Sequence, residues 1–588
     1  MTAGIMERNQ HCWRCATVNP GGDKFCQGCG ASLVQRDNTT RYLCAAAQLN
    51  EAYANSAIRE FLVEPLRAIP PTPGVDTTAV LREAVASRAR RRIRDAAVLA
   101  LLVVLLFTDP VLFLPWLVFA LVLALLLGRF VISRRNAIIA VVVVVIGGAI
   151  AAILGTVGVA ALAILAALGA SSSSGGSGSY PGDGTYPGTP APSSAGALVA
   201  IYVTLLVVVP LLIVAVVAID KFAVHYLVYK RFRRTDFNPD GRTSPHEWER
   251  RLRGLGLSAF HYPLHRVAAA TEQVDRAGER ADVVVHRGYS PFIGAGVPVG
   301  DQVIALALEP SDEDEEPLPI DVNGLHQHVA DAIGRLRSTS TLGPGRRLEN
   351  LTEREQVLLS ADRLVVDHGL VPEILPNLDT APSSQISTEQ ARLLADAAVE
   401  WARYYRCFRV EAWDRDLTTS CYLHAGTDQK MLFLEWRFFA LLPILPVYRT
   451  IDEYRDPVLS PIKATLVELL VLPATIVGRL ASVFRRFKPA KQGEHEVVPA
   501  KYGADRSLRE FAQAAQVQSE FQDLDVKRYV RILNSTLYRA VGEYLQERGY
   551  SAVEFMRMAD PVVYDMRGSM NIDSAIGSRS SVKNTRKV

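Results

Sequence analysis

Residues 197–219 read ALVAIYVTLLVVVPLLIVAVVAI, an apolar run without a charged residue. A helix needs about 20 such residues to cross the hydrocarbon core of a bilayer. This is the last of four apolar runs, which cover residues 96–107, 111–127, 137–168 and 197–219. Backbone within hydrocarbon must satisfy its own hydrogen bonds, which favours helices. We therefore expect an all-α membrane region of about four spans, arranged as helical hairpins, of which the first (96–127) is either a full or a re-entrant hairpin.

Basic residues flank these runs and predict their orientation. Clusters at residues 88–94, 129–135 and 230–234 should all face the cytoplasm, because cytoplasmic flanks are enriched in Lys and Arg. The Ser/Gly/Pro-rich loop at 170–196 then lies outside. We expect a multi-pass protein of the cytoplasmic (inner) membrane with both termini in the cytoplasm. No run carries an ionisable residue at its centre, which disfavours a transporter or pump.

Four cysteines near the N-terminus have the spacing of a zinc site. Cys12 and Cys15 form one CxxC pair, and Cys26 and Cys29 form a second pair ten residues later. Two such pairs complete a tetrahedral site of four thiolates, which leaves no open position on the ion. We expect structural Zn²⁺, with metal binding supplying the folding energy of this small module. A redox role for one CxxC pair is the alternative.

The stretch CWRCATVNPGGDKFCQGCGASL resembles the zinc-ribbon family of short bacterial N-terminal modules. The resemblance implies that the four cysteines are metal ligands. The core Cys15, Asn19, Cys26 also resembles a zinc finger, some of whose members bind single-stranded RNA. That family has a Trp before the first Cys, whereas Trp13 lies between the first two cysteines here, so this resemblance does not imply RNA binding.

Composition gives few further limits. A chain of 588 residues predicts several domains, and a net charge of +3 indicates no particular partner. The three remaining cysteines, Cys44, Cys407 and Cys421, form no disulfide framework, as expected for a reducing compartment. The first residues lack the apolar region of a signal peptide.

Helix signals surround the membrane block. Apolar residues at i, i+4 spacing predict an amphipathic helix over 41–67, and Asp76 or Thr77 can cap a helix that reaches the arginines at 88–94. Asp321 and the capping box Ser387–Gln390 begin two more helices, the second running through Trp401. A long helix with an apolar stripe, closed by Gly549, is expected after residue 507.

Strand signals are equally clear in the second half. The sequence from residue 281 to 308 predicts strand, loop, strand, and three alternating runs between 406 and 441 predict a meander. The soluble part should therefore be an α+β domain. We expect these boundaries: a zinc ribbon at 1–36, a helical cytoplasmic linker at 37–92, the transmembrane region at 93–222, a cytoplasmic α+β domain at 223–500, a helical segment at 501–560 and a disordered basic tail at 561–588.

Several motifs admit two interpretations. The glycine-rich stretch GAGVPVG (residues 294–300) is an ordinary loop rather than a phosphate loop, because a strand and not a helix follows it. The acidic run at 309–316 is a solvated loop or a weak cation site. The apolar segment at 458–487 contains charged residues and either lies on the membrane surface or forms a fifth span.

The order of zinc ribbon, RYLCAAA, membrane hairpins, RGYSPFIGAG and an Asn/Ile/Gly tail resembles a group of uncharacterised actinobacterial membrane proteins. That resemblance implies no activity. We identify no catalytic or cofactor-binding residues, which favours a non-enzyme. Our first hypothesis is a sensing or scaffold protein that binds protein partners on the cytoplasmic face of the lipid bilayer.

Two alternatives stay open. A membrane-bound enzyme would need a site within 240–430, such as a pocket that gathers His286, Glu309 or His326. Nucleic-acid binding through the ribbon and the arginines at 88–94 is the second alternative, and we consider it weaker. Neither the ligand nor the partner follows from the sequence.

Overall fold

The structure is a computed structural model of the chain. It describes residues 10–11, 18–19, 27, 38–108, 194–233, 237, 267, 280–312, 314, 316–337, 348, 350–397, 399–413, 415–452, 458–484 and 498–557.

The chain forms two compact units, and each is assembled from segments that are far apart in the sequence. The first, which we call the sheet unit, comprises residues 1–85, 237–451 and 488–588. The second, which we call the helical unit, comprises residues 86–236 and 452–487. The chain therefore passes from one unit to the other four times, after residues 85, 236, 451 and 487.

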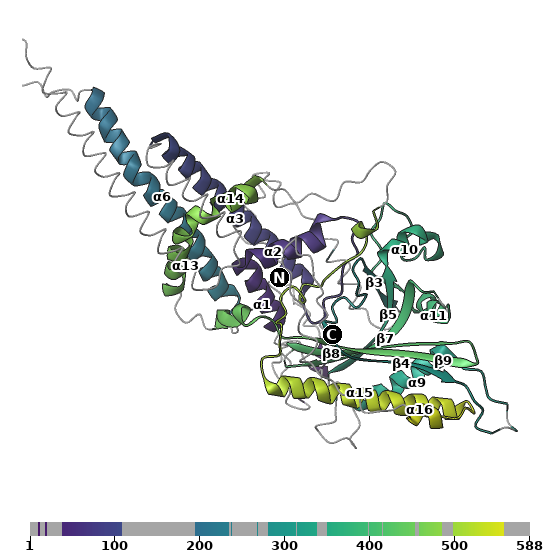
Figure 1. Cartoon of the computed structure of the whole chain (residues 1–588). Coiled ribbons are helices and arrows are strands. Elements are labelled where there is room, and N and C mark those ends of the chain that lie inside the picture. Colours follow the sequence, from purple (N-terminus) through teal and green to yellow (C-terminus); the bar gives the residue numbers. More distant parts are fainter. Residues whose placement is uncertain are drawn as a thin grey trace, which may run out of the picture. The chain divides into compact units, whose positions relative to one another are not determined.

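A seven-stranded mixed sheet is the centre of the sheet unit (Figure 1), with the order β4-β9-β8-β7-β5-β3-β6. Its strands are β3 (Arg280–His286), β4 (Val297–Ala307), β5 (Leu351–Ser360), β6 (Gln385–Ser387), β7 (Ala402–Ala412), β8 (Leu417–Thr427) and β9 (Met431–Leu441). Only β3 and β5 pair in parallel. The predicted meander is confirmed as β7-β8-β9, and the predicted strands at 281–308 are β3 and β4.

The helices of the sheet unit are mostly short. They are α1 (Asn38–Leu49), α2 (Glu51–Ile58), the π-helical turn η1 (Arg59–Val63), α9 (Val322–Gly334), α10 (Ala361–Val366), α11 (Thr388–Asp396), α12 (Pro446–Arg449), α15 (Glu520–Glu547) and α16 (Val553–Arg557), with 3₁₀ turns η4 (Arg335–Arg337), η6 (His368–Leu370), η7 (Thr450–Asp452) and η8 (Pro499–Lys501). The predicted helix over 41–67 is instead broken at Asn50, whose side chain accepts from the Tyr53 amide and caps α2. The helix that begins after Ser387 ends at Asp396, not at Trp401.

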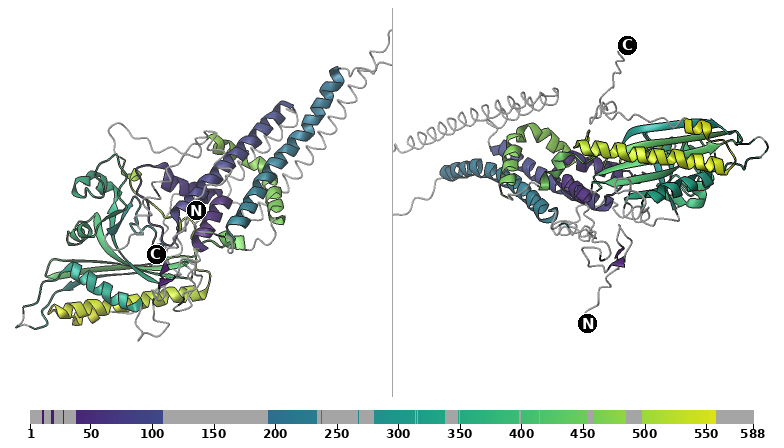
Figure 2. Two further views of the ribbon diagram at one scale, coloured as in Figure 1. Left: turned by 180° about the vertical axis from the view of Figure 1, so that it is seen from behind. Right: turned by 90° about the horizontal axis from the view of Figure 1, so that it is seen from below.

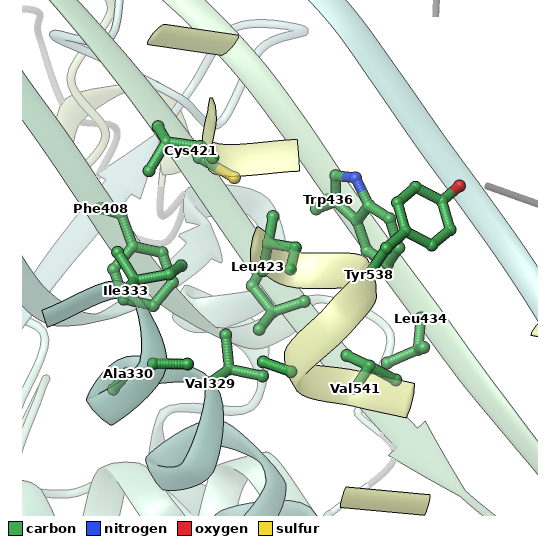
Figure 3. Packing of buried hydrophobic residues seen from close by; sticks show 14 of the residues in the cluster. Val329, Ala330, Ile333, Phe408, Cys421, Leu423, Leu434, Trp436, Tyr538 and Val541 are labelled. Atoms are coloured by element: carbon green, nitrogen blue, oxygen red, sulfur yellow. The ribbon is translucent and has the colours of Figure 1, made fainter. Parts of the chain in front are cut away.

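The largest core lies where α9 and α15 pack side by side on one face of β4, β9, β8 and β7 (Figures 1 and 2). Asp321 caps α9 as predicted, because its side chain accepts from the Asn323 amide. Trp436 is fully buried there, its ring 5.0 Å from that of Tyr538 (Figure 3). Its indole Nε1 donates to Asn534 Oδ1 at 3.0 Å. The predicted apolar stripe of α15 therefore lies in the core.

Further along the same face, α10 and α11 cover β7, β5 and β3, where valines and leucines form a second core. The opposite face carries a smaller aromatic cluster in which Phe292 contacts Tyr405, Tyr422 and Phe439. Cys407 and Cys421 illustrate the alternation of a strand pair. Cys407 faces this aromatic cluster, whereas Cys421 faces the α9–α15 core, so these two free thiols lie on opposite faces of the sheet.

The glycine-rich stretch at 294–300 is a loop, as predicted, and its amides hold a carboxylate of the same chain. Gly294 and Gly296 have φ of +84° and +91°, and their amides donate to Glu510 Oε1 at 2.9 and 3.3 Å. The Ser507 amide donates to the other carboxylate oxygen at 2.7 Å. Burial is the largest influence on Glu510 and raises its pKa, although these amides oppose that shift. The anion that such a loop can bind is therefore internal.

The helical unit contains α3 (Thr77–Thr108), which enters it after Val85, together with α6 (Ser194–Arg231), α13 (Leu459–Leu470) and α14 (Leu472–Phe484). Asp76 caps α3 as predicted, because its Oδ1 accepts from the Ala79 amide. The apolar run at 96–107 is the continuation of this helix, and the run at 197–219 lies within α6. The runs at 111–127 and 137–168 and the loop at 170–193 lie outside the described residues.

The expected fold class is wrong. The prediction is a membrane region of about four spans beside an α+β domain. The described residues instead form a mixed β-sheet with helices, which is an α/β arrangement. They contain one unbroken helix that is long and apolar enough to cross a bilayer, Val207–Arg231. Two apolar segments among the described residues differ from separate spans for a physical reason. The run at 96–107 is the end of a helix that begins at Thr77, and the segment at 458–487 is a pair of short helices.

Gly296→Ala should strongly destabilise the sheet unit, because a Cβ at this position would lie 2.3 Å from the Ala440 carbonyl oxygen and the backbone has a positive φ. Strain of this kind costs about 1–3 kcal/mol before the clash is added. Gly426→Ala, which meets nothing within 4 Å, is the matched control and should change stability by less than about 1 kcal/mol. Thermal unfolding of both full-length variants tests this, and an equal stability of the two would contradict the account.

Candidate membrane-attachment site

Charged side chains from all four helices meet inside the helical unit. Asp95 of α3 pairs with Arg94 at 2.8 Å and with Arg479 of α14 at 2.6 Å. Asp220 of α6 accepts from Arg94 at 3.1 Å and from Arg90 at 2.5 Å. Because each carboxylate joins at least two cations, these ion pairs form one connected group.

The group extends to α13 through Glu468. This carboxylate pairs with Lys221 Nζ at 2.9 Å and with Arg94 at 3.4 Å, and it also accepts from Arg479. Ser482 of α14 donates to Asp95 Oδ2 at 2.8 Å. We call this group the charge network and define it as Arg90, Arg94, Asp95, Asp220, Lys221, Glu468, Arg479 and Ser482.

The charge network is buried at its centre. The side chains of Asp95, Asp220 and Arg479 are only 3%, 4% and 5% exposed. Buried charges are tolerated where they are paired and hydrogen-bonded, and removing one partner of such a pair typically costs about 3–5 kcal/mol. The network therefore fixes α13 and α14 against α3 and α6, whatever solvent surrounds the unit.

Large apolar side chains are exposed on all four helices that the structure describes in the helical unit. Leu211 and Ile219 of α6 are 61% and 68% exposed, Leu466 of α13 is 59% exposed, and Phe484 of α14 is 74% exposed. Other exposed apolar residues on these helices are Val103, Val104, Phe107, Val207, Val208, Leu212, Val214, Phe222, Leu459, Ile462, Val467, Leu470, Val477 and Leu480. Extensive exposed apolar surface on a protein usually marks a site of contact with a membrane or another protein.

Charges inside and apolar groups outside invert the distribution of a water-soluble helix bundle. The arrangement matches helices in lipid, where ionisable residues face the interior of the bundle and pair with one another. A smaller apolar core, which includes Val98, Ile213 and Leu472, fills the space between the helices. The helical unit is therefore the candidate membrane-attachment site.

Helix α6 is long enough to cross a bilayer over Val207–Arg231. Helices α13 and α14 are as apolar when taken together, but they meet at 98°. Each has 12 or 13 residues and is about 18–20 Å long, shorter than the hydrocarbon core of about 30 Å. Neither helix alone forms the fifth span that the sequence left open at 458–487.

The arginines at 88–94 point inward. Arg88, Arg91 and Arg94 are buried, Arg90 pairs with Asp220, and Arg92 donates to the Val483 carbonyl oxygen at 2.7 Å. Sequence alone placed these guanidiniums at the surface, because their partners, Asp220 and the end of α14, are more than 120 residues away. The nucleic-acid alternative stays a prediction, and these buried side chains do not favour it.

The predicted zinc ligands, Cys12, Cys15, Cys26 and Cys29, lie outside the described residues. The structure describes two short strands next to them, β1 (Gln10–His11) and β2 (Val18–Asn19), which pair antiparallel. The six residues that connect these strands include Cys12 and Cys15.

The structure does not bring together the residues considered for an enzyme. His286 ends β3, whereas Glu309 follows β4, and five strand pairings separate β3 from β4 in the sheet order. His326 of α9 is fully buried, with its ring 5.0 Å from that of Tyr404 and with neither ring nitrogen hydrogen-bonded. His328 instead faces two glutamates of α15, Glu543 at 4.0 Å and Glu547 at 3.6 Å.

Comparison with known proteins relates one part of the chain to a family. Residues 301–578 match the AbeC-like domain. The match begins within β4 and extends past α16, so it includes β5 to β9 as well as α9 and α15. No curated protein and no solved structure matches the chain significantly. The matching AbeC-like domain brings no stated activity to these residues.

His326 predicts a measurable loss of stability in acid. Burial, with smaller contributions from Arg406 and His424, lowers its pKa from 6.5 to about 3, so the native protein keeps this imidazole neutral. Unfolded chains bind the proton below pH 6.5, and stability therefore falls as the pH drops from 6.5 towards 3. The slope from this group is up to about 1.4 kcal/mol per pH unit.

Denaturant unfolding at several pH values checks the effect of His326. His326→Leu should remove this contribution, so that the free energy of unfolding falls less steeply below pH 6.5 than it does in the wild type. The matched control is His328→Leu on the same helix, which is 23% exposed and should keep the slope. An unchanged slope in His326→Leu would contradict the assignment.

Proposed function

We propose that the helical unit attaches this protein to the cytoplasmic membrane and that the sheet unit binds protein partners there. The observation that supports attachment is the inverted distribution of charge in the helical unit, where the charge network lies inside and the apolar residues lie outside. Helix α6 supplies the crossing, and the bent pair α13–α14 enters the lipid without crossing it.

Basic residues support a cytoplasmic sheet unit. The apolar part of α6 is followed by Lys230, Arg231 and Arg233, and positive residues of this kind favour the cytoplasmic side. Arg90 and Arg94 of α3 pair with Asp220, which directly follows the apolar run at 197–219. We therefore place the C-terminal end of α6, where the chain leaves the helical unit for the first time, on the cytoplasmic side.

Protein binding is the function that the described part of the sheet unit supports best. Its cores are filled by apolar side chains, and the ionisable groups considered for catalysis are dispersed or buried. An enzyme with a site within 240–430 stays an alternative that no described group of side chains favours. A scaffold or sensor needs only a surface, and the chain links the sheet unit to the helical unit four times.

Two arginines on the outside of α6 should prevent stable attachment. Val208 and Leu211 are three residues apart and both exposed, so Val208→Arg with Leu211→Arg places two charges in lipid. Each costs about 2.5–3.5 kcal/mol at the centre of a membrane helix. The control is Val366→Arg, at an exposed apolar residue of α10 in the sheet unit.

Alkaline carbonate extraction of cell membranes is the measurement. The wild type and Val366→Arg should stay in the membrane pellet, whereas the doubly substituted variant should be released or degraded. Release of the wild type by carbonate would refute attachment through α6.

We also propose that the N-terminal module holds structural Zn²⁺ through Cys12, Cys15, Cys26 and Cys29. The pairing of β1 with β2 around the first CxxC pair supports this, because zinc ribbons place such pairs on tight antiparallel turns.

Replacing Cys26 and Cys29 by Ser should abolish bound zinc, measured by elemental analysis of the purified protein. Cys44→Ser is the control and should retain one equivalent, whereas zinc retained without Cys26 and Cys29 would refute the site.

A further inference from the structure

Strand β4 is at the edge of the sheet and has one open side. It pairs with β9 from Val297 to Ala307, and it has no second strand partner in the part of the chain that the structure describes. The other edge strand, β6, has only three residues. The long open edge is therefore on β4.

Alternate residues of β4 direct their backbone groups towards this open side. The Leu308 amide donates to the Lys430 carbonyl oxygen at 2.8 Å, so even-numbered residues face β9. The backbone groups of odd-numbered residues point away from β9. The first two odd-numbered residues after the strand, Glu309 and Ser311, already have partners for these groups. The Ser551 amide donates to the Glu309 carbonyl oxygen at 2.9 Å, and the Ser311 amide donates to the Gly549 carbonyl oxygen at 2.9 Å.

By the same alternation, the backbone amide and carbonyl groups of four residues point to the open edge: Asp301, Val303, Ala305 and Ala307. The open stretch has defined ends. An irregular register between Pro298 and Gly300 limits it on one side, and the pairing of Pro310 with Tyr550 limits it on the other. It therefore has room for one short strand.

Natural proteins usually protect such an edge with a charge, a proline or a bulge in the strand. Between residues 302 and 307 the sequence is QVIALA, which contains none of these, and Val303 is 75% exposed. An unprotected edge of this kind is a template for adding a strand, as in domains that bind extended peptides.

The surrounding charge indicates which strand would fit. Asp301 is exposed at one end of the open stretch, and exposed acidic residues follow its other end at Glu309, Asp312, Asp314 and Glu316. Among the described residues these carboxylates form no ion pair. A segment with apolar residues at its centre and Lys or Arg at its ends is therefore complementary to this edge in both shape and charge.

We propose that the open edge of β4 binds an extended, basic-ended segment of a protein partner, which adds a strand to the sheet. The bound segment would exchange backbone hydrogen bonds with Asp301, Val303, Ala305 and Ala307. This inference rests on the proposed protein-binding function and names the chemistry of its partner. It does not depend on membrane attachment.

The test uses the full-length protein and a synthetic peptide of alternating valine and threonine with two lysines at each end. Val303→Pro removes one amide hydrogen that points to the open edge, and it leaves the hydrogen bonds to β9 intact, because proline is tolerated on edge strands with its nitrogen facing out. Val303→Thr keeps the amide and is the matched control. Fluorescence anisotropy of the labelled peptide measures binding.

We expect Val303→Pro to weaken binding at least tenfold and Val303→Thr to change it less than twofold. A peptide with glutamates in place of the lysines should bind at least tenfold more weakly at low salt. Bound peptide should also slow hydrogen exchange at the amides of residues 303, 305 and 307, while those of 304 and 306 stay unchanged because β9 already protects them.

Equal binding of the peptide to the wild type and to Val303→Pro would overturn the inference. So would a result in which the peptide binds neither the full chain nor a variant that ends at Arg557. Binding only to that shortened variant would also overturn it, because the chain's own C-terminal segment would then be the occupant. Carbonate extraction of Val303→Pro should match that of the wild type. A failure of membrane attachment is therefore distinguishable from a failure of the open edge.

Discussion

The pairing of Asp95 with Arg94 and Arg479 is the interaction on which the arrangement of the helical unit depends. These groups come from α3 and α14, which are almost 400 residues apart in the sequence, and their side chains are almost completely buried. A buried carboxylate without its cations would be costly, so α13 and α14 can pack on α3 and α6 only in the geometry that completes the charge network. The network thus adds a specific constraint to the apolar core between these helices.

This constraint also bears on the sheet unit. The segment that carries β3 to β9 leaves the helical unit after residue 236 and returns to it after residue 451. Both ends of that segment therefore lead into helices that the charge network holds together, α6 on one side and α13 on the other. The two helices next to this segment therefore belong to one connected group of ion pairs.

Local patterns predicted much of the sheet unit. The caps at Asp321 and Ser387, the alternation in β7 to β9 and the stripe of α15 are all short-range signals, and the structure confirms them. Long-range pairing could not be predicted. Nothing near GAGVPVG indicates that its amides donate hydrogen bonds to Glu510, more than 200 residues later. Nothing near Arg90 and Arg94 indicates that they pair with Asp220. Apolar runs were overinterpreted because hydropathy does not show where a helix begins or how two helices bend.

The most direct test of the inverted charge distribution is the solvent that the outer surface of α13 and α14 contacts. A nitroxide on a cysteine placed at Leu466 or Phe484, in protein reconstituted into liposomes, reports collisions with oxygen, which concentrates in lipid, and with a water-soluble nickel chelate. We expect collisions with oxygen to dominate at both positions, and collisions with nickel to dominate at a control label on the exposed Val366 of the sheet unit. Nickel dominating at Leu466 and Phe484 would contradict the claim that this surface lies in lipid.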